Sequence, residues 1–349
     1  FFFKQKTAYE ISTRDWSSDV CSSDLDPNFA PVYATLFNYN YQTNVNLAAE
    51  YFEKWLTLSD EDIKSCYYRA YLKYAQGLFQ DAINKADECI AGSKDNPYSK
   101  LYRIRAIAYN KLNDSVHTIE CYEKYMEKEN PENITAEDYA NYMKNLAKIP
   151  GNKPKISIML GKLVQANDNE QEKAKAIKET AKLIEEQKDY LFAAELYKSI
   201  LVVKKVPNNL DLYNIAYNYY RAESLDSSLQ YYTQYEQKYP NEILPFFMSG
   251  KVASIIDSTL TLGLAVPHYE KVIQIGLADT VKYKSQLMAS YKYLFQYYAI
   301  GKKDIPTATT YIDKALSLDP ADADAVKFKS MLTAPPAKQT TQPKQNKKP

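Results

Sequence analysis

Small and large apolar residues follow one pattern that recurs along this chain at a nearly constant interval. In each copy a small residue is followed four positions later by a second apolar or aromatic residue. The copies are Ala48/Phe52, Ala82/Ala86, Thr118/Tyr122, Ala193/Tyr197, Ser228/Tyr232, Ala265/Tyr269 and Ala308/Ile312. Their second members lie 34, 36, 75, 35, 37 and 43 residues apart, and the interval of 75 fits two periods with one degenerate unit between them. A period of about 34 predicts an all-α array of stacked antiparallel helix pairs.

The pattern has a steric basis. Two antiparallel helices cross closely only where a small side chain, such as Ala82 or Ala216, lets the backbones approach, and large apolar residues one turn away fill the space around it. Each pair leaves an apolar face that only the next pair covers, so stability is a sum of interfaces between neighbours. Prolines are expected to end one pair and start the next. They are Pro97, Pro131, Pro207, Pro240 and Pro320.

The composition narrows the range of functions. The 349 residues contain 44 basic and 43 acidic side chains, without the basic excess that phosphate binding needs, so we expect no nucleic-acid partner. Glycine is scarce, at 8 residues, and tyrosine is abundant, at 33, which favours long helices over glycine-rich nucleotide-binding loops. No apolar run reaches the roughly 18 residues that span a bilayer. We therefore expect no transmembrane segment.

Three stretches of the chain resemble the tetratricopeptide repeat family. Residues 76–83 are similar to its turn between two helices, and residues 315–320 to the end of its second helix. Another unit carries the family's signature positions in register, namely Leu212, Ile215, Ala216, Tyr219, Ser228, Tyr232, Tyr235 and Pro240. The likeness covers most of residues 26–332. It implies a right-handed superhelical solenoid of about seven to eight repeats, in which the first helix of each pair lines a concave groove that binds a protein or an extended peptide.

The repeat pattern is irregular in three places. Around residues 132–170 the signature fades: Thr135 and Asp138 form a capping box, residues 153–167 predict a helix, and Pro150, Gly151 and Pro154 predict a bend or a longer linker between them. Extra residues occur at 257–263, and one long helix is expected over 280–300. Residues 321–332 are amphipathic, which is typical of a terminal capping helix.

The two ends of the chain differ from the repeats. Residues 4–10 (KQKTAYE) and 15–25 (DWSSDVCSSDL) resemble a translated sequencing adapter, so we expect residues 1–25 to be non-native and the natural N-terminus, with any signal peptide or lipid anchor, to be missing. Residues 333–349 carry four lysines and no acidic or aromatic side chain, which predicts a disordered tail.

Two tyrosine stripes are the main candidates for a binding surface. Tyr67, Tyr71 and Tyr74 are spaced i, i+4 and i+7 along one predicted first helix, and therefore share a face. Tyr213, Tyr217 and Tyr220 repeat the spacing and are followed by Arg221. Corresponding positions between the stripes hold Arg103, Lys178 and Lys182. Phenol rings and cations together would suit an acidic peptide or a chain carboxylate. A second interpretation remains open, in which the tyrosines only pack one repeat against the next.

Enzymatic chemistry has little support in the sequence. The only histidines, His117 and His268, stand in no metal-ligand or triad pattern, so we expect no enzyme, no metal and no cofactor. Outside the first 25 residues the cysteines are Cys66, Cys89 and Cys121. In the repeat frame Cys66 and Cys89 face each other across two helices of one pair, either as buried thiols, which we favour, or as a disulfide.

The sequence thus predicts a non-catalytic scaffold or adaptor that binds a protein or peptide, with an envelope or periplasmic location in a bacterium as a secondary hypothesis and the cytoplasm as its alternative. The alternative function is a helical-repeat protein that binds a glycan or another small ligand on tyrosine platforms, as the abundance of tyrosine would allow. The sequence does not indicate an oligomeric state.

Overall fold

A computed structural model describes residues 28–59, 63–93, 96–166 and 169–333, and this part of the chain contains helices and turns but no strand. The predicted all-α repeat fold is therefore confirmed. The predictions for residues 1–25 and for the tail beyond residue 333 fall outside the described residues. The chain divides into two compact units, unit 1 up to Asn167 and unit 2 from Asp168 onward, next to the irregular stretch seen in the sequence.

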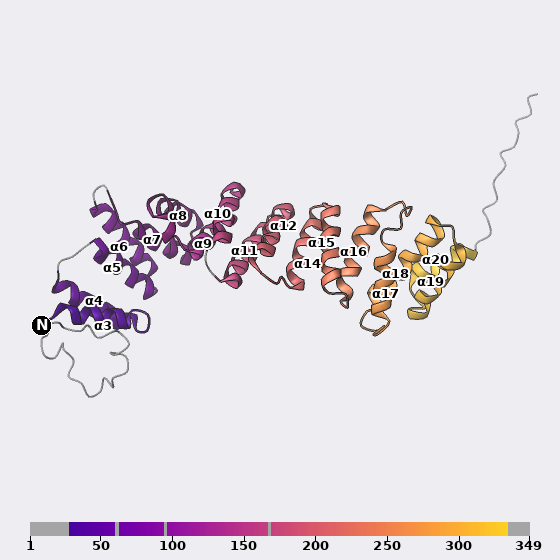
Figure 1. The fold of residues 1–349 in the computed structure, drawn as a ribbon, viewed down its shortest axis with the longest axis horizontal. Coiled ribbons are helices and arrows are strands. Elements are labelled where there is room, and N and C mark those ends of the chain that lie inside the picture. Colours follow the sequence, from indigo (N-terminus) through magenta and orange to yellow (C-terminus); the bar gives the residue numbers. More distant parts are fainter. Residues whose placement is uncertain (1–27, 60–62, 94–95, 167–168, 334–349) are drawn as a thin grey trace, which may run out of the picture. The chain divides into compact units, whose positions relative to one another are not determined.

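Unit 1 is built from four consecutive helix pairs in its described residues (Figure 1). The first helices of the pairs are α3 (Ala30–Asn40), α5 (Ile63–Ala75), α7 (Ser99–Lys111) and α9 (Ala136–Ala147). The second helices are α4 (Val45–Thr57), α6 (Phe79–Gly92), α8 (Ser115–Lys128) and α10 (Lys153–Gln165), and a short 3₁₀ turn, η1 (Pro131–Asn133), precedes α9. Each pair packs on the next, so that α5 touches α7 as well as its own partner α6.

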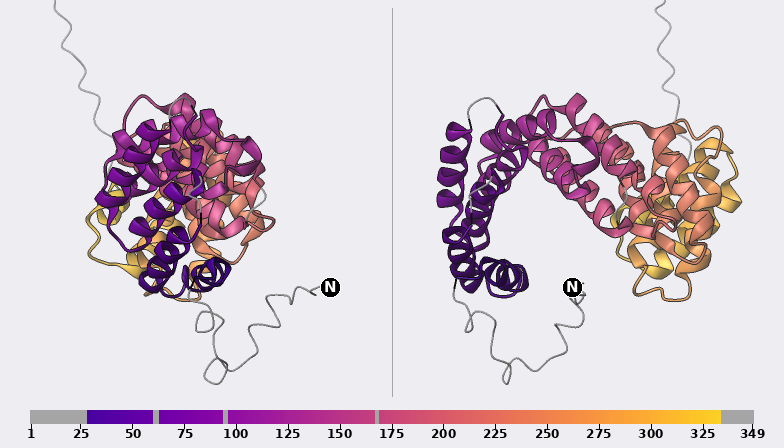
Figure 2. Two further views of the ribbon diagram at one scale, coloured as in Figure 1. Left: turned by 90° about the vertical axis from the view of Figure 1, so that its left-hand side faces the viewer. Right: turned by 60° about the vertical axis from the view of Figure 1, so that its left-hand side comes forward.

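Unit 2 repeats this arrangement over its described residues (Figure 2). Its first helices are α11 (Glu170–Glu186), α14 (Asn209–Arg221), α16 (Ile243–Ile256) and α18 (Lys284–Gln296), the last continued by a π-helical turn, η2 (Tyr297–Gly301). The second helices are α12 (Tyr190–Lys198) with the short α13 (Ile200–Val203), α15 (Leu225–Lys238), α17 (Val266–Gly276) and α19 (Ile305–Leu318). A final helix, α20 (Ala323–Thr333), packs against α19.

The register predicted from the small residues is confirmed. All seven small positions of the sequence pattern are completely buried, at 0% exposure, including the polar Thr118 and Ser228. Their larger partners are also in the core, with Tyr122 and Tyr232 at 0% and Tyr269 at 5%. The hydroxyl of Ser228 donates to the carbonyl oxygen of Ala216, which satisfies a polar group at a close helix crossing.

Five of the turns inside the pairs use one left-handed residue at a corresponding position. Gly77 has φ +80°, and the corresponding position holds Asn113, Lys188, Glu223 and Lys303, with φ between 57° and 62°. Left-handed backbone costs an ordinary L residue on the order of 1 kcal/mol, which glycine avoids. Only Gly77 among these five positions therefore has the residue that the turn favours.

Replacing Gly77 with alanine is expected to lower the free energy of unfolding by about 1 kcal/mol, because the new side chain would meet nothing within 4 Å and only the left-handed backbone is strained. Gly161 in the middle of α10 is a matched control, since its surroundings are equally open and its backbone is helical. Gly161→Ala should raise stability by about 0.5–1 kcal/mol. Urea unfolding of both variants measures the two shifts, and shifts of the same sign would contradict this reading of the turn.

Around residues 132–170 the predicted capping box and second helix are present, and a turn over residues 148–152 stands where a bend or a longer linker was expected. Two other expectations from the sequence need correction. The helix expected over residues 280–300 begins only at Lys284, because Asp279 accepts a hydrogen bond from the backbone of Lys282 and holds a turn there. Cys66 and Cys89 form a disulfide across α5 and α6, with Cα atoms 5.9 Å apart, and are not the thiols that we favoured.

The extra residues at 257–263 form a compact loop held by a buried carboxylate. Asp257 is 2% exposed and accepts hydrogen bonds from the backbone N–H groups of Thr261, Leu262 and Gly263. Burial acts to raise the pKa of Asp257, but these N–H groups outweigh it and hold the pKa below the usual range. The loop packs on η2, since a side chain added at Gly263 would collide with Tyr297.

Candidate binding surface

An aromatic pocket lies on the first helices of unit 1. Its volume is about 340 Å³, and residues from α3, α5 and α7, or just before α7, surround it. They are Phe37, Asn38, Tyr41, Tyr67, Tyr68, Tyr71, Tyr98 and Lys100. Two members of the predicted stripe, Tyr67 and Tyr71, are therefore brought into one cavity with rings from the neighbouring helices.

Tyr67 is the centre of this aromatic group. Its ring is stacked on Tyr71 at 6.2 Å and meets Tyr98 edge to face at 5.5 Å. Tyr71 in turn lies 6.4 Å from Tyr41 of the preceding pair. Both stripe tyrosines are half-buried, packed against the core on one side and lining the pocket on the other. The packing interpretation thus fits one side of these rings. The other side faces the pocket, and binding of a partner there remains a prediction.

The three phenols of the first stripe are neutral at physiological pH. Burial raises the pKa of Tyr67 to about 12, although the nearby Arg103 guanidinium acts in the opposite direction. Burial also raises the pKa of Tyr71 and of Tyr74. At physiological pH these hydroxyls can therefore donate hydrogen bonds to an acceptor on a ligand.

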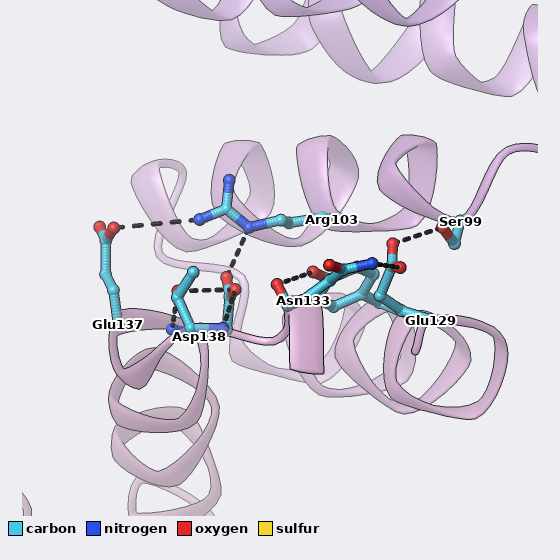
Figure 3. Close-up of polar contacts among 8 residues, drawn as sticks. Ser99, Arg103, Glu129, Asn133, Glu137 and Asp138 are labelled. Atoms are coloured by element: carbon cyan, nitrogen blue, oxygen red, sulfur yellow. Dashed lines mark hydrogen bonds and ion pairs between the residues drawn. The ribbon is translucent and has the colours of Figure 1, made fainter. Parts of the chain in front are cut away.

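Arg103 is engaged within the protein (Figure 3). Its Nε donates to Oδ1 of Asp138 at 2.6 Å, and another of its nitrogens lies 3.9 Å from Glu137. Asp138 is completely buried at the start of α9, where it also closes the predicted capping box with Thr135. The contact links the first helices of two successive pairs. The role of Arg103 in binding a partner remains a prediction.

Lys178 makes the equivalent contact in unit 2. Its Nζ lies 2.6 Å from Oδ1 of the buried Asp211, and Lys204 lies 2.7 Å from Oδ2. Asp211 also closes a capping box, here with Asn208 at the start of α14. Lys182, one turn beyond Lys178 on α11, is exposed. In both units, a basic side chain on the first helix of one pair thus forms an ion pair with the capping aspartate at the start of the next pair's first helix.

This ion pair predicts a pH dependence. Burial acts to raise the pKa of Asp211, but hydrogen bonds from Lys178 and Lys204 outweigh it and lower the pKa. A carboxylate with a lowered native pKa contributes stability above its unfolded pKa of about 3.9 and loses that contribution as the pH falls through the native value. Asp211→Asn should therefore flatten the loss of stability below about pH 4. Unfolding titrations at several pH values measure the slope, and an unchanged slope would rule out this role for Asp211.

The second tyrosine stripe forms a stack on α14. Tyr213 and Tyr217 are nearly parallel, with centroids 5.4 Å apart, and Tyr220 lies 6.4 Å further along. All three are half-buried, and Tyr213 meets the buried Tyr232 edge to face. The guanidinium of Arg221 lies 3.9 Å from the ring centroid of Tyr190 on α12 and donates to its hydroxyl, and it lies 5.9 Å from the ring centroid of Tyr217.

Both histidines contact carboxylates. His117, in the first turn of α8, lies 2.7 Å from Asp114 and stacks on Tyr109. His268 lies 2.8 Å from Glu236, and this contact joins α17 to α15.

Within the described ranges no group of three or more His, Cys, Asp or Glu side chains is arranged to hold a metal ion. In the same residues no helix has both the length and the apolar character needed to cross a membrane.

Sequence reasoning missed several residues of the pocket. Asn38, Tyr41, Tyr98 and Lys100 come from neighbouring helices or from a helix start, and the stripe spacing within one helix does not indicate them. The repeat period could have indicated Lys100 as a neighbour of Tyr67, because it follows Tyr67 by 33 residues (100−67), which is close to one repeat. The same offset relates Lys178 to Asp211 (211−178).

The tandem pairs and their shared register define a helical-repeat protein. The sequence matches no protein-family model and no curated protein. Among solved structures, the chain is similar to the C-terminal part of a TPR repeat-containing protein from Cytophaga hutchinsonii, with 19% identity, a TM-score of 0.43, and coverage of 75% of this chain and 98% of that one.

Two further solved structures are similar at lower scores. One is YrrB, described as a TPR protein with an unusual peptide-binding site, with 14% identity, a TM-score of 0.36, and coverage of 70% of this chain and 97% of that one. The other is the TPR2AB domain of yeast Sti1 in a complex with pHSP90, with 16% identity, a TM-score of 0.35, and coverage of 81% and 99%.

Proposed function

We propose that this chain is a non-catalytic tetratricopeptide-type scaffold that binds a protein partner through an extended segment seated on its first helices. The observation that carries the proposal is the cavity of unit 1, in which rings from α3, α5 and the start of α7 line one concave site. Aromatic walls with a few polar groups are typical of ligand sites. Rings also supply large contact areas at a small cost in conformational entropy.

The predicted site residues enter this proposal with different roles. Tyr67 and Tyr71 contact the partner directly in the pocket, with Tyr74 further along the same helix face. Arg103 and Lys178 act mainly as ion-pair partners of buried aspartates between repeats. In unit 2, Lys182, Arg221 and the stacked tyrosines of α14 form a second contact surface for the same class of partner.

Site-specific photocrosslinking tests the proposed function. A photoreactive residue at Asn38, an exposed position on the pocket wall, should capture a discrete protein partner in cells. The same residue at Glu120, exposed on α8 and outside the pocket lining, is the control. Capture of one partner from both positions with equal yield, or from neither, would argue against a binding site on this surface.

The location is part of the proposal. The disulfide between Cys66 and Cys89 supports an oxidising compartment such as the cell envelope of a bacterium, because cytosolic thiols are kept reduced. Alkylation of intact cells followed by mass spectrometry should find these two cysteines protected. Full alkylation of both would instead favour the cytoplasm.

A further inference from the structure

The size of the unit 1 pocket limits what it can hold. Ligand pockets in proteins span about 300–1,000 Å³, and this one, at about 340 Å³, lies at the lower end. It therefore has room for one large side chain and its backbone, not for an oligosaccharide. Its walls are mainly aromatic, and rings pack best with other rings in edge-to-face or offset arrangements. Tyr67 already makes such contacts with Tyr98 and Tyr71.

The charge of the pocket distinguishes between two kinds of aromatic ligand site. Ring faces alone would also suit a cation. However, Lys100 lines this pocket and makes no hydrogen bond or ion pair within the described residues. Glu129 acts on Lys100 electrostatically, but its carboxylate is hydrogen-bonded to the hydroxyl of Ser99 at 2.6 Å and to the amide of Asn133 at 2.8 Å (Figure 3). A half-buried ammonium that has no direct ion pair within the described residues repels a cationic ligand and attracts an anionic one.

On these grounds, and resting on the proposed function, we propose that the pocket accepts an aromatic side chain of the partner's extended segment and that an acidic residue beside it pairs with Lys100. The aromatic ring contacts Tyr67 and Tyr71, and the carboxylate accepts a hydrogen bond from Lys100 Nζ. The neutral phenols of the wall donate to the backbone carbonyl groups of the same segment.

Four short peptides on a common Gly-Ser background test the preference against the full chain. They carry Trp-Glu, Trp-Gln, Trp-Lys or Ala-Glu at the centre, and maltose serves as a sugar probe. Binding is measured from chemical-shift changes of the tyrosine ring signals. The Trp-Glu peptide should bind about tenfold more tightly than Trp-Lys or Ala-Glu, as one charge-assisted hydrogen bond or one buried ring would give. Equal binding of all peptides, tighter binding of Trp-Lys or of maltose, or no binding of Trp-Glu at millimolar concentration would overturn the inference.

Two variants assign the preference to the pocket. Lys100→Met should remove the advantage of Trp-Glu over Trp-Gln, whereas Lys124→Met, which changes an exposed lysine on α8 outside the pocket, should leave it. Asn38→Trp should fill the cavity and weaken Trp-Glu about tenfold, whereas Thr35→Trp, also exposed on α3 but not in the pocket wall, should not. Asn38 is exposed and Lys100 is only half-buried, so the fold should be retained. Equal effects of a variant and its control would contradict the assignment.

The two proposals can fail separately. If crosslinking at Asn38 captures a partner whose bound segment lacks an aromatic-acidic pair, the scaffold function stands and the ligand preference is wrong. If Trp-Glu binds as expected but no protein is captured, the pocket chemistry stands and the protein-binding function is wrong.

Discussion

Asp138→Ala is expected to lower the free energy of unfolding by about 3 kcal/mol, because removal of one partner of a buried ion pair leaves the other charge without compensation. Asp138 is completely buried and accepts from Arg103, whose side chain is itself only 22% exposed. The change also removes one half of the capping box with Thr135, which adds to the loss. Urea unfolding followed by far-UV circular dichroism measures the effect.

Two further variants show whether the loss comes from the ion pair. Glu137→Ala is the matched control, since Glu137 is 74% exposed and 3.9 Å from Arg103, and it should cost less than about 0.5 kcal/mol. The double change Arg103→Met with Asp138→Leu should recover most of the stability, because two apolar groups leave no unpaired charge. An Asp138→Ala variant that is no less stable than Glu137→Ala would show that the ion pair of Arg103 and Asp138 does not stabilise the packing of the two repeats.

Loss of the disulfide is expected to be the second large effect. Cys66 and Cys89 are 23 residues apart, and closing a loop of that length in the unfolded chain is worth about 3 kcal/mol. Replacing both cysteines with alanine, or reducing the wild type, should therefore lower the unfolding midpoint by similar amounts. Hydrogen exchange should show the loss in α5 and α6, the two helices that the bond joins.

The one other cysteine of the described residues makes a clean control possible. Burial raises the pKa of Cys121 to about 11, so its thiol is a poor nucleophile at neutral pH and should not exchange with the disulfide. A reducing agent should then have no effect on the variant that lacks Cys66 and Cys89. If reduction leaves the wild-type midpoint unchanged, the bond does not stabilise unit 1.

The sequence predicted the repeat register because the steric rule behind it is local. A small residue at the crossing and a large one four positions later are needed in every pair, whatever the rest of the chain does. For this reason Ala82, Thr118 and Ser228 could be placed in the core before any coordinates were considered. The same rule applies to Tyr232, whose ring is buried as expected.

The candidate binding surface was less predictable because residues of neighbouring repeats form it. Arg103 and Lys178 were interpreted as groove cations because they stand at positions that correspond to the tyrosine stripes. Their aspartate partners lie one repeat further along the chain, where the pattern within one helix does not indicate them. Tyr98 and Lys100 were missed because their contribution depends on how α7 packs beside α5. The cysteine pair could be placed face to face from the sequence, but its oxidation state could not.

The central claim is that the tyrosine pocket of unit 1 is where a partner binds, and the affinity of the crosslinked partner tests it most directly. Its dissociation constant should be measured for the wild type and for Asn38→Trp, which fills the pocket from its exposed wall. The account predicts binding about tenfold weaker or more, with an unchanged unfolding midpoint. An unchanged dissociation constant would contradict it.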